Sequence, residues 1–177
     1  MSQTTYTAPY TIEQLNDMDA PQFVQVLGGI YEHSPWVAEQ AATQRPFASA
    51  DALTAAMRHA VDAAGVEPQL KLVRAHPELA GKAAVRGELT AESTREQAGA
   101  GLDQCTPEEF ARLQALNAQY NEKFGFPFIL AVRGYDRHGI IDNFSQRVEN
   151  DRDTELRASL EQIHRIAGFR LHDLISG

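Results

Sequence analysis

Apolar residues recur at helical spacing along most of the chain, and this periodicity most limits the possible folds. Between Ser49 and Gly65 one helical face collects Leu53, Ala56, Met57, Ala60, Val61 and Ala64. Near the C-terminus the same spacing links Leu156, Leu160, Ile163, Ile166, Ala167 and Leu174. The length of 177 residues suits one hydrophobic core. The pattern therefore predicts an all-α fold, a helical bundle of about eight helices forming a single domain over residues 1–177.

Capping residues mark where several of these helices begin and end. Ser34-Pro35 and Thr106-Pro107 each place a capping hydroxyl before a first-turn proline, and Ser49 or Asp51 precedes another apolar stripe. Gly125 is expected to end the helix that starts at Thr106. The expected apolar face of that helix consists of Phe110, Leu113, Leu116 and Tyr120.

One apolar run, residues 128–132, does not follow helical spacing. It reads Phe128-Ile129-Leu130-Ala131-Val132 between Pro127 and Gly134, and it is too short for its period to decide the structure. We expect a short, buried, extended segment, which among helices would leave main-chain amides able to meet a ligand. Simple packing in the core is an equally good interpretation.

Composition excludes several classes of protein. The net charge of −8 argues against a nucleic-acid partner, which usually requires a basic patch. No apolar run approaches the ~20 residues of a membrane-spanning helix, and the first ten residues do not resemble a signal peptide. We therefore expect a cytoplasmic protein that binds neither nucleic acid nor membranes.

Motifs for metal and cofactor binding are absent from the sequence. None of the six histidines forms an HExxH pair, and the single cysteine argues against a zinc cluster. There is no glycine-rich dinucleotide loop, Walker sequence or GxSxG elbow. We expect no metal and no cofactor. Cys105 is interpreted as a structural thiol in preference to a nucleophile.

His76 is the histidine whose context best suits chemistry. It ends an apolar stretch and precedes Pro77, which disfavours helical backbone at the residue before it. A histidine at such a junction projects from fixed backbone and titrates near neutral pH. The alternative is a helix-terminal histidine that only interacts with the helix dipole.

Two further groups of polar residues are candidates. Ser93, Glu96 and Gln97 share one helical face and would suit a ligand bearing amides, although Ser93-x-x-Glu96 also fits a capping box. Arg170 lies beside an apolar helical face, where an arginine must snorkel, pair with an acid or hold an anion. Arg165 is an equal candidate on spacing alone.

Six stretches, in order along the chain, carry a family resemblance. They are YEHSPWVAEQ (31–40), RPF (45–47), LVRAHPELAGK (72–82), LTAESTREQAGAGLD (89–103), LNAQYNEKFGFPFILAVRG (116–134) and IAGFRLHDL (166–174). Together they resemble the 2-oxo-4-hydroxy-4-carboxy-5-ureidoimidazoline (OHCU) decarboxylase family over nearly the whole chain. One departure is Glu78, where the family more usually has aspartate.

The resemblance implies a role for each matched residue. His76 would be the catalytic acid/base, with Glu96 as its partner, and Arg170, chosen over Arg165 by the family motif, would complete the catalytic set. The substrate-binding residues would be Pro77, Ser93, Thr94, Arg95, Glu96, Gln97, Phe128, Ile129, Leu130, Ala131 and Val132.

The resemblance also implies an activity. The chain would be a cofactor-independent carboxy-lyase, commonly a homodimer, that converts OHCU stereospecifically to (S)-allantoin in urate catabolism. The alternative is a non-catalytic helical module that binds an anionic ureide. The two differ in whether loss of His76 abolishes turnover or only weakens binding.

Overall fold

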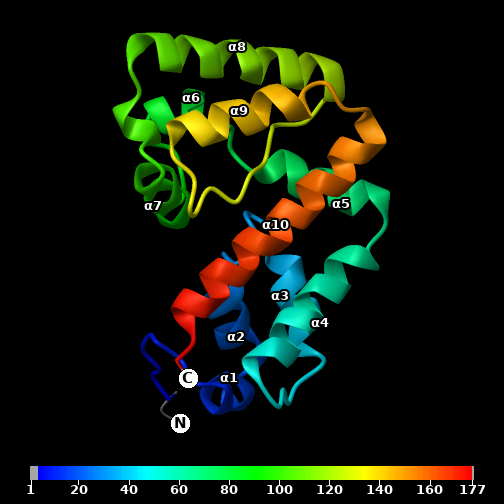
Figure 1. The fold of residues 1–177 in the computed structure, drawn as a ribbon. Helices are drawn as coiled ribbons and strands as arrows, with labels where there is room; N and C mark the ends of the chain where they lie inside the picture. The colour runs from blue at the N-terminus through cyan, green and yellow to red at the C-terminus, as the bar shows by residue number, and fades with distance from the viewer. Residues whose placement is uncertain (1–3, 177) are drawn as a thin grey trace. The chain divides into compact units, whose positions relative to one another are not determined.

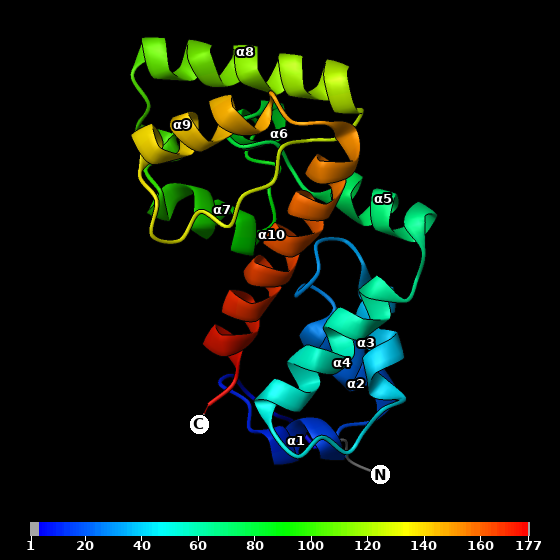
Figure 2. The same ribbon diagram turned by 45° about the vertical axis from the view of Figure 1, so that its right-hand side comes forward.

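The computed structural model describes residues 4–176, except for the side chains of residues 82 and 83 (Figures 1 and 2). Within this range no β-strand forms, and Tyr10 and Ile175 make an isolated parallel bridge. The helices are α1 (Ile12–Asp17), α2 (Ala20–Leu27), α3 (Pro35–Ala42), α4 (Ala50–Asp62), α5 (Val66–Ala75), α6 (Lys82–Val85), α7 (Ala91–Gly99), η1 (Leu102–Gln104), α8 (Pro107–Phe124), α9 (Arg137–Arg147) and α10 (Arg152–Leu174). The predicted all-α fold is confirmed. None of these helices combines the length and apolarity needed to cross a membrane.

Contacts divide the chain into two compact units. The first unit consists of residues 1–72 and 164–177, and the second of residues 73–163. Helices α5 and α10 each contribute residues to both units.

The first unit packs α2 against α3 and α3 against α4 (Figure 2). Ser49 caps α4, since its hydroxyl accepts a hydrogen bond from Ala52 N at 3.1 Å, as predicted. Pro35 opens α3 as predicted, but the Ser34 hydroxyl donates to the Glu32 carbonyl instead of capping the helix. The fully buried side chains here include Leu15, Phe23, Leu27, Leu53, Met57 and Leu72.

The second unit contains α8 and α9, which lie side by side in both views (Figures 1 and 2). Thr106 forms a capping box with Glu109, and Gly125 ends α8 in the left-handed conformation at φ +77°, as predicted. Tyr120 is fully buried, with Phe124, Phe126, Phe128 and Phe144 around its ring. Phe110 departs from the expected apolar face, because it is 38% exposed.

Residues 128–132 form a buried connection between α8 and α9. The segment belongs to no helix and no strand, and all five of its side chains are buried. Its burial therefore agrees with the sequence prediction. No strand lies beside it in a ladder. The Val132 carbonyl accepts from Tyr135 N at 2.9 Å, and the other main-chain groups of the segment must find partners elsewhere.

Candidate active site

His76 lies directly after the last residue of α5, in the second unit. Its N–H donates to the Val73 carbonyl at 3.2 Å, and Pro77 then takes the chain out of the helix. The His76 residue is only 7% exposed. The predicted junction of helix and turn is thus present, and the imidazole is held in a largely dry environment.

Side-chain amides fix the backbone of the loop that follows His76. Gln97 is the main one, because its Oε1 accepts from Ala80 N at 3.0 Å while its Nε2 donates to the Glu78 carbonyl at 3.3 Å. Two amides from α8 complete the set: Gln114 Nε2 donates to Ala80 O at 2.6 Å, and Asn117 Nδ2 donates to Leu79 O at 3.0 Å. Residues 78–80 are therefore held in one conformation, two residues beyond the histidine.

The backbone of Ala80 explains why the loop needs this support. Its φ of +51° is in the left-handed region, which costs a residue with a Cβ about 1–2 kcal/mol. Hydrogen bonds at both its N–H and its carbonyl offset that cost. Gly81 is required by a close approach, since an added Cβ would lie 2.6 Å from Glu78 Cβ. The Glu78 carboxylate, at the position of the family departure, accepts from Asn121 Nδ2.

Helix α7 carries the predicted Ser93–Gln97 stretch. Ser93 and Gln97 are buried and Glu96 is half-buried, whereas Thr94 and Arg95 are exposed. The capping-box interpretation of Ser93 and Glu96 is wrong: Thr90 is the N-cap, and its hydroxyl accepts from Ser93 N at 3.1 Å. Ser93, Glu96 and Gln97, the residues predicted to share a face, are thus all more buried than Thr94 and Arg95.

We predict that Gln97→Ala lowers the free energy of unfolding by about 1–3 kcal/mol, because it leaves the buried N–H of Ala80 without an acceptor. Urea unfolding followed by circular dichroism measures this change. Arg95→Ala, on the exposed part of the same helix, is the matched control and should change stability little. Unchanged stability in Gln97→Ala would show that the side chain does not support the loop.

Two main-chain groups of residues 128–132 are bound by side chains that sequence reasoning missed. The Ile129 carbonyl accepts from Arg147 Nη1, and Ala131 N donates to Gln162 Oε1 at 3.0 Å. Both contacts lie within the second unit. The missed residues come from α9 and α10, and no local pattern in the sequence links them to the segment.

Arg170 lies in the first unit, on α10, and forms a buried ion pair. Its Nη2 donates to Glu32 Oε2 at 2.8 Å, and its Nη1 donates to the Gly29 carbonyl at 3.1 Å. The two side chains are 5% and 1% exposed. Arg165, in contrast, is exposed. Burial therefore separates the two arginines that helical spacing left equal, and Glu32 is a partner that sequence reasoning missed.

The described residues contain no cluster suited to a metal ion, and the single thiol is a poor nucleophile. Among residues 4–176, no group of three or more His, Cys, Asp or Glu side chains is placed to hold a metal ion. Burial, followed by the charge of Glu109, raises the pKa of the Cys105 thiol above its ordinary value. Cys105 Sγ donates to the Leu102 carbonyl at 3.3 Å. These features suit a structural thiol, since a nucleophile needs a lowered pKa.

Cys105→Ala is accordingly expected to retain the catalytic rate of the unaltered protein. Iodoacetamide at neutral pH should react slowly with Cys105, because a raised pKa keeps the thiol protonated there. Mass spectrometry follows the modification and a rate assay follows activity. Rapid alkylation with parallel loss of activity would instead assign a chemical role to this thiol.

Comparisons with known proteins agree on one family. The family model for OHCU decarboxylase matches residues 16–172 of this chain. The 2-oxo-4-hydroxy-4-carboxy-5-ureidoimidazoline decarboxylase of Haloferax volcanii is 44% identical, covering 94% of this chain and 96% of that protein. The enzyme of the same name from Halalkalicoccus jeotgali is 42% identical, covering 93% and 91%.

A solved structure matches the fold over nearly the whole chain. The crystal structure of (S)-allantoin synthase superposes with a TM-score of 0.76 at 31% identity. The match covers 93% of this chain and 54% of that one, so this chain spans about half of its length. Sequence and fold thus agree over almost all of the present chain, which belongs to the OHCU decarboxylase family.

Proposed function

We propose that this chain decarboxylates OHCU to (S)-allantoin in the breakdown of urate. Family membership over residues 16–172 supplies the reaction class. The structural observation that carries the proposal is the buried His76, which comes just before a loop whose backbone is bound by three amide side chains. A cytoplasmic homodimer is proposed with it, on the family resemblance, and light scattering of the purified protein checks the dimer.

The proposed reaction uses side chains and main-chain groups of this chain. The bond between ring carbon 4 and the carboxylate breaks, CO2 leaves, and the electron pair moves into the ring towards carbon 5 and its imine nitrogen. That nitrogen takes up one proton. A second proton then adds to one face of carbon 5, which carries the ureido group and becomes the stereocentre. Loss of the 4-hydroxyl proton leaves a carbonyl at carbon 4. The enzyme must orient the carboxylate, stabilise developing charge and place the proton on one face.

The site residues divide these tasks in the proposal. His76 exchanges a proton with the 4-hydroxyl or delivers it to carbon 5, with Glu96 as its partner. Arg170 holds an anionic or carbonyl oxygen of the substrate, since a guanidinium presents donors in a fixed fork. The Glu32 carboxylate keeps that guanidinium in one orientation.

Substrate binding is assigned to one proline and two stretches. We propose that Pro77, the Ser93–Gln97 stretch and residues 128–132 bind the ring and the ureido group. The side-chain amide of Gln97 already hydrogen-bonds to the backbone of residues 78–80. Its proposed contribution therefore includes fixing the loop that follows His76. Main-chain N–H and C=O groups of residues 128–132 match the donors and acceptors of a cyclic ureide.

The rate of OHCU consumption tests the proposal. OHCU generated freshly in the cuvette is followed by ultraviolet absorbance, with and without the protein. We expect decay that accelerates in proportion to protein concentration and saturates with substrate. Saturable binding of allantoin with OHCU decay at the spontaneous rate would replace the proposal by a non-catalytic ureide-binding module.

A further inference from the structure

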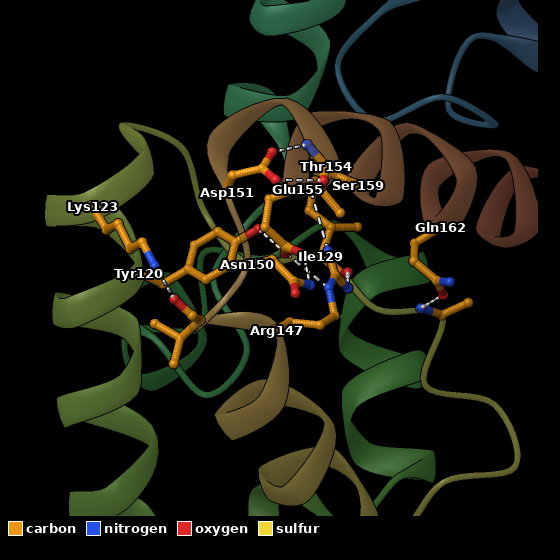
Figure 3. A network of polar contacts seen from close by, with 12 residues as sticks. Tyr120, Lys123, Ile129, Arg147, Asn150, Asp151, Thr154, Glu155, Ser159 and Gln162 are labelled. Carbon is orange, nitrogen blue, oxygen red and sulfur yellow. Dashed lines mark hydrogen bonds and ion pairs between the residues drawn. The ribbon is translucent and has the colours of Figure 1, made fainter.

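A buried ion pair joins α9 to α10 in the second unit (Figure 3). Arg147 Nε donates to Glu155 Oε1 at 2.9 Å, and the two side chains are 11% and 0% exposed. Glu155 also accepts from Tyr120 OH at 2.6 Å and from Asn150 Nδ2 at 2.9 Å. Burial, followed by this hydrogen bond, raises the pKa of Tyr120, so its hydroxyl stays a donor. Arg147, Tyr120 and Asn150 all donate to the buried Glu155 carboxylate, so its charge is compensated.

One further donor of Arg147 reaches the segment 128–132, while its Nη2 donates to Ser159 Oγ at 3.3 Å. Its Nη1 donates to the Ile129 carbonyl, and its Cζ lies 4.5 Å from the centroid of the Phe128 ring. The Phe128 ring is also held by Phe144, on which it stacks with centroids 3.9 Å apart and planes 9° apart. One guanidinium therefore holds two consecutive residues of the segment, one by its main chain and one by its ring.

The other end of the segment is held by Gln162, from α10 (Figure 3). Its Oε1 accepts from Ala131 N at 3.0 Å. Arg147 and Gln162 thus bind one acceptor and one donor of a main chain that has no neighbouring strand. Such side-chain contacts replace the hydrogen bonds that a sheet would supply, and they fix which main-chain groups remain for a ligand.

We infer that Arg147, held by Glu155, is a positioning residue that sets the main chain of residues 128–132 for substrate recognition, with Gln162 as the second anchor. The inference rests on the proposed function and adds residues that do not themselves touch substrate. If the main-chain donors and acceptors are already fixed, little conformational entropy is lost when the ureide ring binds. Loosening that array should weaken substrate binding and relax the handedness of the product.

Arg147→Lys is the test variant. Lysine keeps the charge beside Glu155, but a single ammonium cannot bind the Glu155 carboxylate and the Ile129 carbonyl with the planar fork of arginine. Arg152→Lys is the matched control. Arg152 Nε donates to the Phe124 carbonyl at 3.3 Å and its Cζ lies 5.6 Å from the Phe126 centroid, which are the same kinds of contact outside residues 128–132.

We expect Arg147→Lys to raise KM about tenfold, consistent with loss of one charge-assisted hydrogen bond. The enantiomeric excess of the allantoin should fall, and amide hydrogen exchange of a peptide covering residues 126–133 should accelerate. Arg152→Lys should leave all three unchanged. A merely structural role would lower the melting temperature without changing KM or the enantiomeric excess of the folded fraction.

Gln162→Leu tests the second anchor if Arg147→Lys does not fold, because Gln162 is only half-buried. It should change KM and product handedness in the same direction. The inference is overturned if both variants fold and keep the wild-type KM and enantiomeric excess. The same holds if only Gln162→Leu folds and keeps both values. Either result would leave the proposed function standing. A wild-type protein that does not accelerate OHCU loss would overturn both.

Discussion

His76→Ala is expected to reduce the rate of OHCU decarboxylation by ~10²–10⁴-fold, the range that a positioned acid/base group supplies. The side chains of Gln97, Gln114 and Asn117 bind the backbone of residues 79 and 80 in the neighbouring loop, so the fold should survive the change. His76→Gln keeps most of the side-chain volume and a polar end but cannot titrate near neutral pH. It should lose activity to a similar extent.

The control for His76 is another histidine of the second unit. His138 is 76% exposed and lies 3.8 Å from Glu109, a surface contact worth little to stability. His138→Ala should keep full activity. Steady-state rates at matched concentrations of folded protein compare the three variants. A folded His76→Ala or His76→Gln protein with the wild-type rate would remove His76 from the chemistry.

The second large effect concerns the buried pair of Arg170 and Glu32. Arg170→Met should lower the free energy of unfolding by about 3–5 kcal/mol, because it removes the cation that balances a carboxylate 1% exposed. Glu32→Gln combined with Arg170→Met removes both charges and should recover most of that stability. Urea unfolding measures the free energy for each variant.

The double variant also separates stability from catalysis. If Arg170 holds the substrate as proposed, a protein carrying Glu32→Gln and Arg170→Met folds yet shows a greatly reduced kcat/KM. Equal stability losses in the single and double variants would contradict the ion-pair account. Wild-type kcat/KM in the stable double variant would show that Arg170 serves the fold alone.

Local signals predicted much of the fold. The Thr106 cap, the Gly125 termination and the break at His76 all depend on residues next to one another in sequence, and the structure confirms each. The pattern Ser93-x-x-Glu96 misled for a local reason as well, because Thr90 offers the same capping chemistry three residues earlier. Where two caps compete, the sequence alone does not decide between them.

Long-range polar contacts could not be predicted. Glu155 meets Tyr120 across 35 positions, and Arg170 meets Glu32 across 138, so neither pair leaves a periodic trace. The positive φ of Ala80 could not be predicted from the sequence, since alanine rarely adopts that conformation. The family resemblance selects Arg170, and its burial in an ion pair with Glu32 distinguishes it physically from the exposed Arg165.

For residues 128–132 too, the local property could be predicted from the sequence and the long-range contacts could not. Their burial follows from an unbroken apolar run, which the sequence displays directly. Which of their main-chain groups are already bound depends on Arg147 and Gln162, from helices that follow the segment. A pattern of apolar residues contains no information about such partners.

The handedness of the product tests the central claim most directly. OHCU also decays without a catalyst, and that route gives racemic allantoin with no net circular dichroism. We expect the wild-type protein to generate rapidly the dichroic signal of (S)-allantoin from fresh OHCU, and His76→Ala to give slow decay and no signal. Racemic allantoin formed at the spontaneous rate by folded wild-type protein would contradict the account.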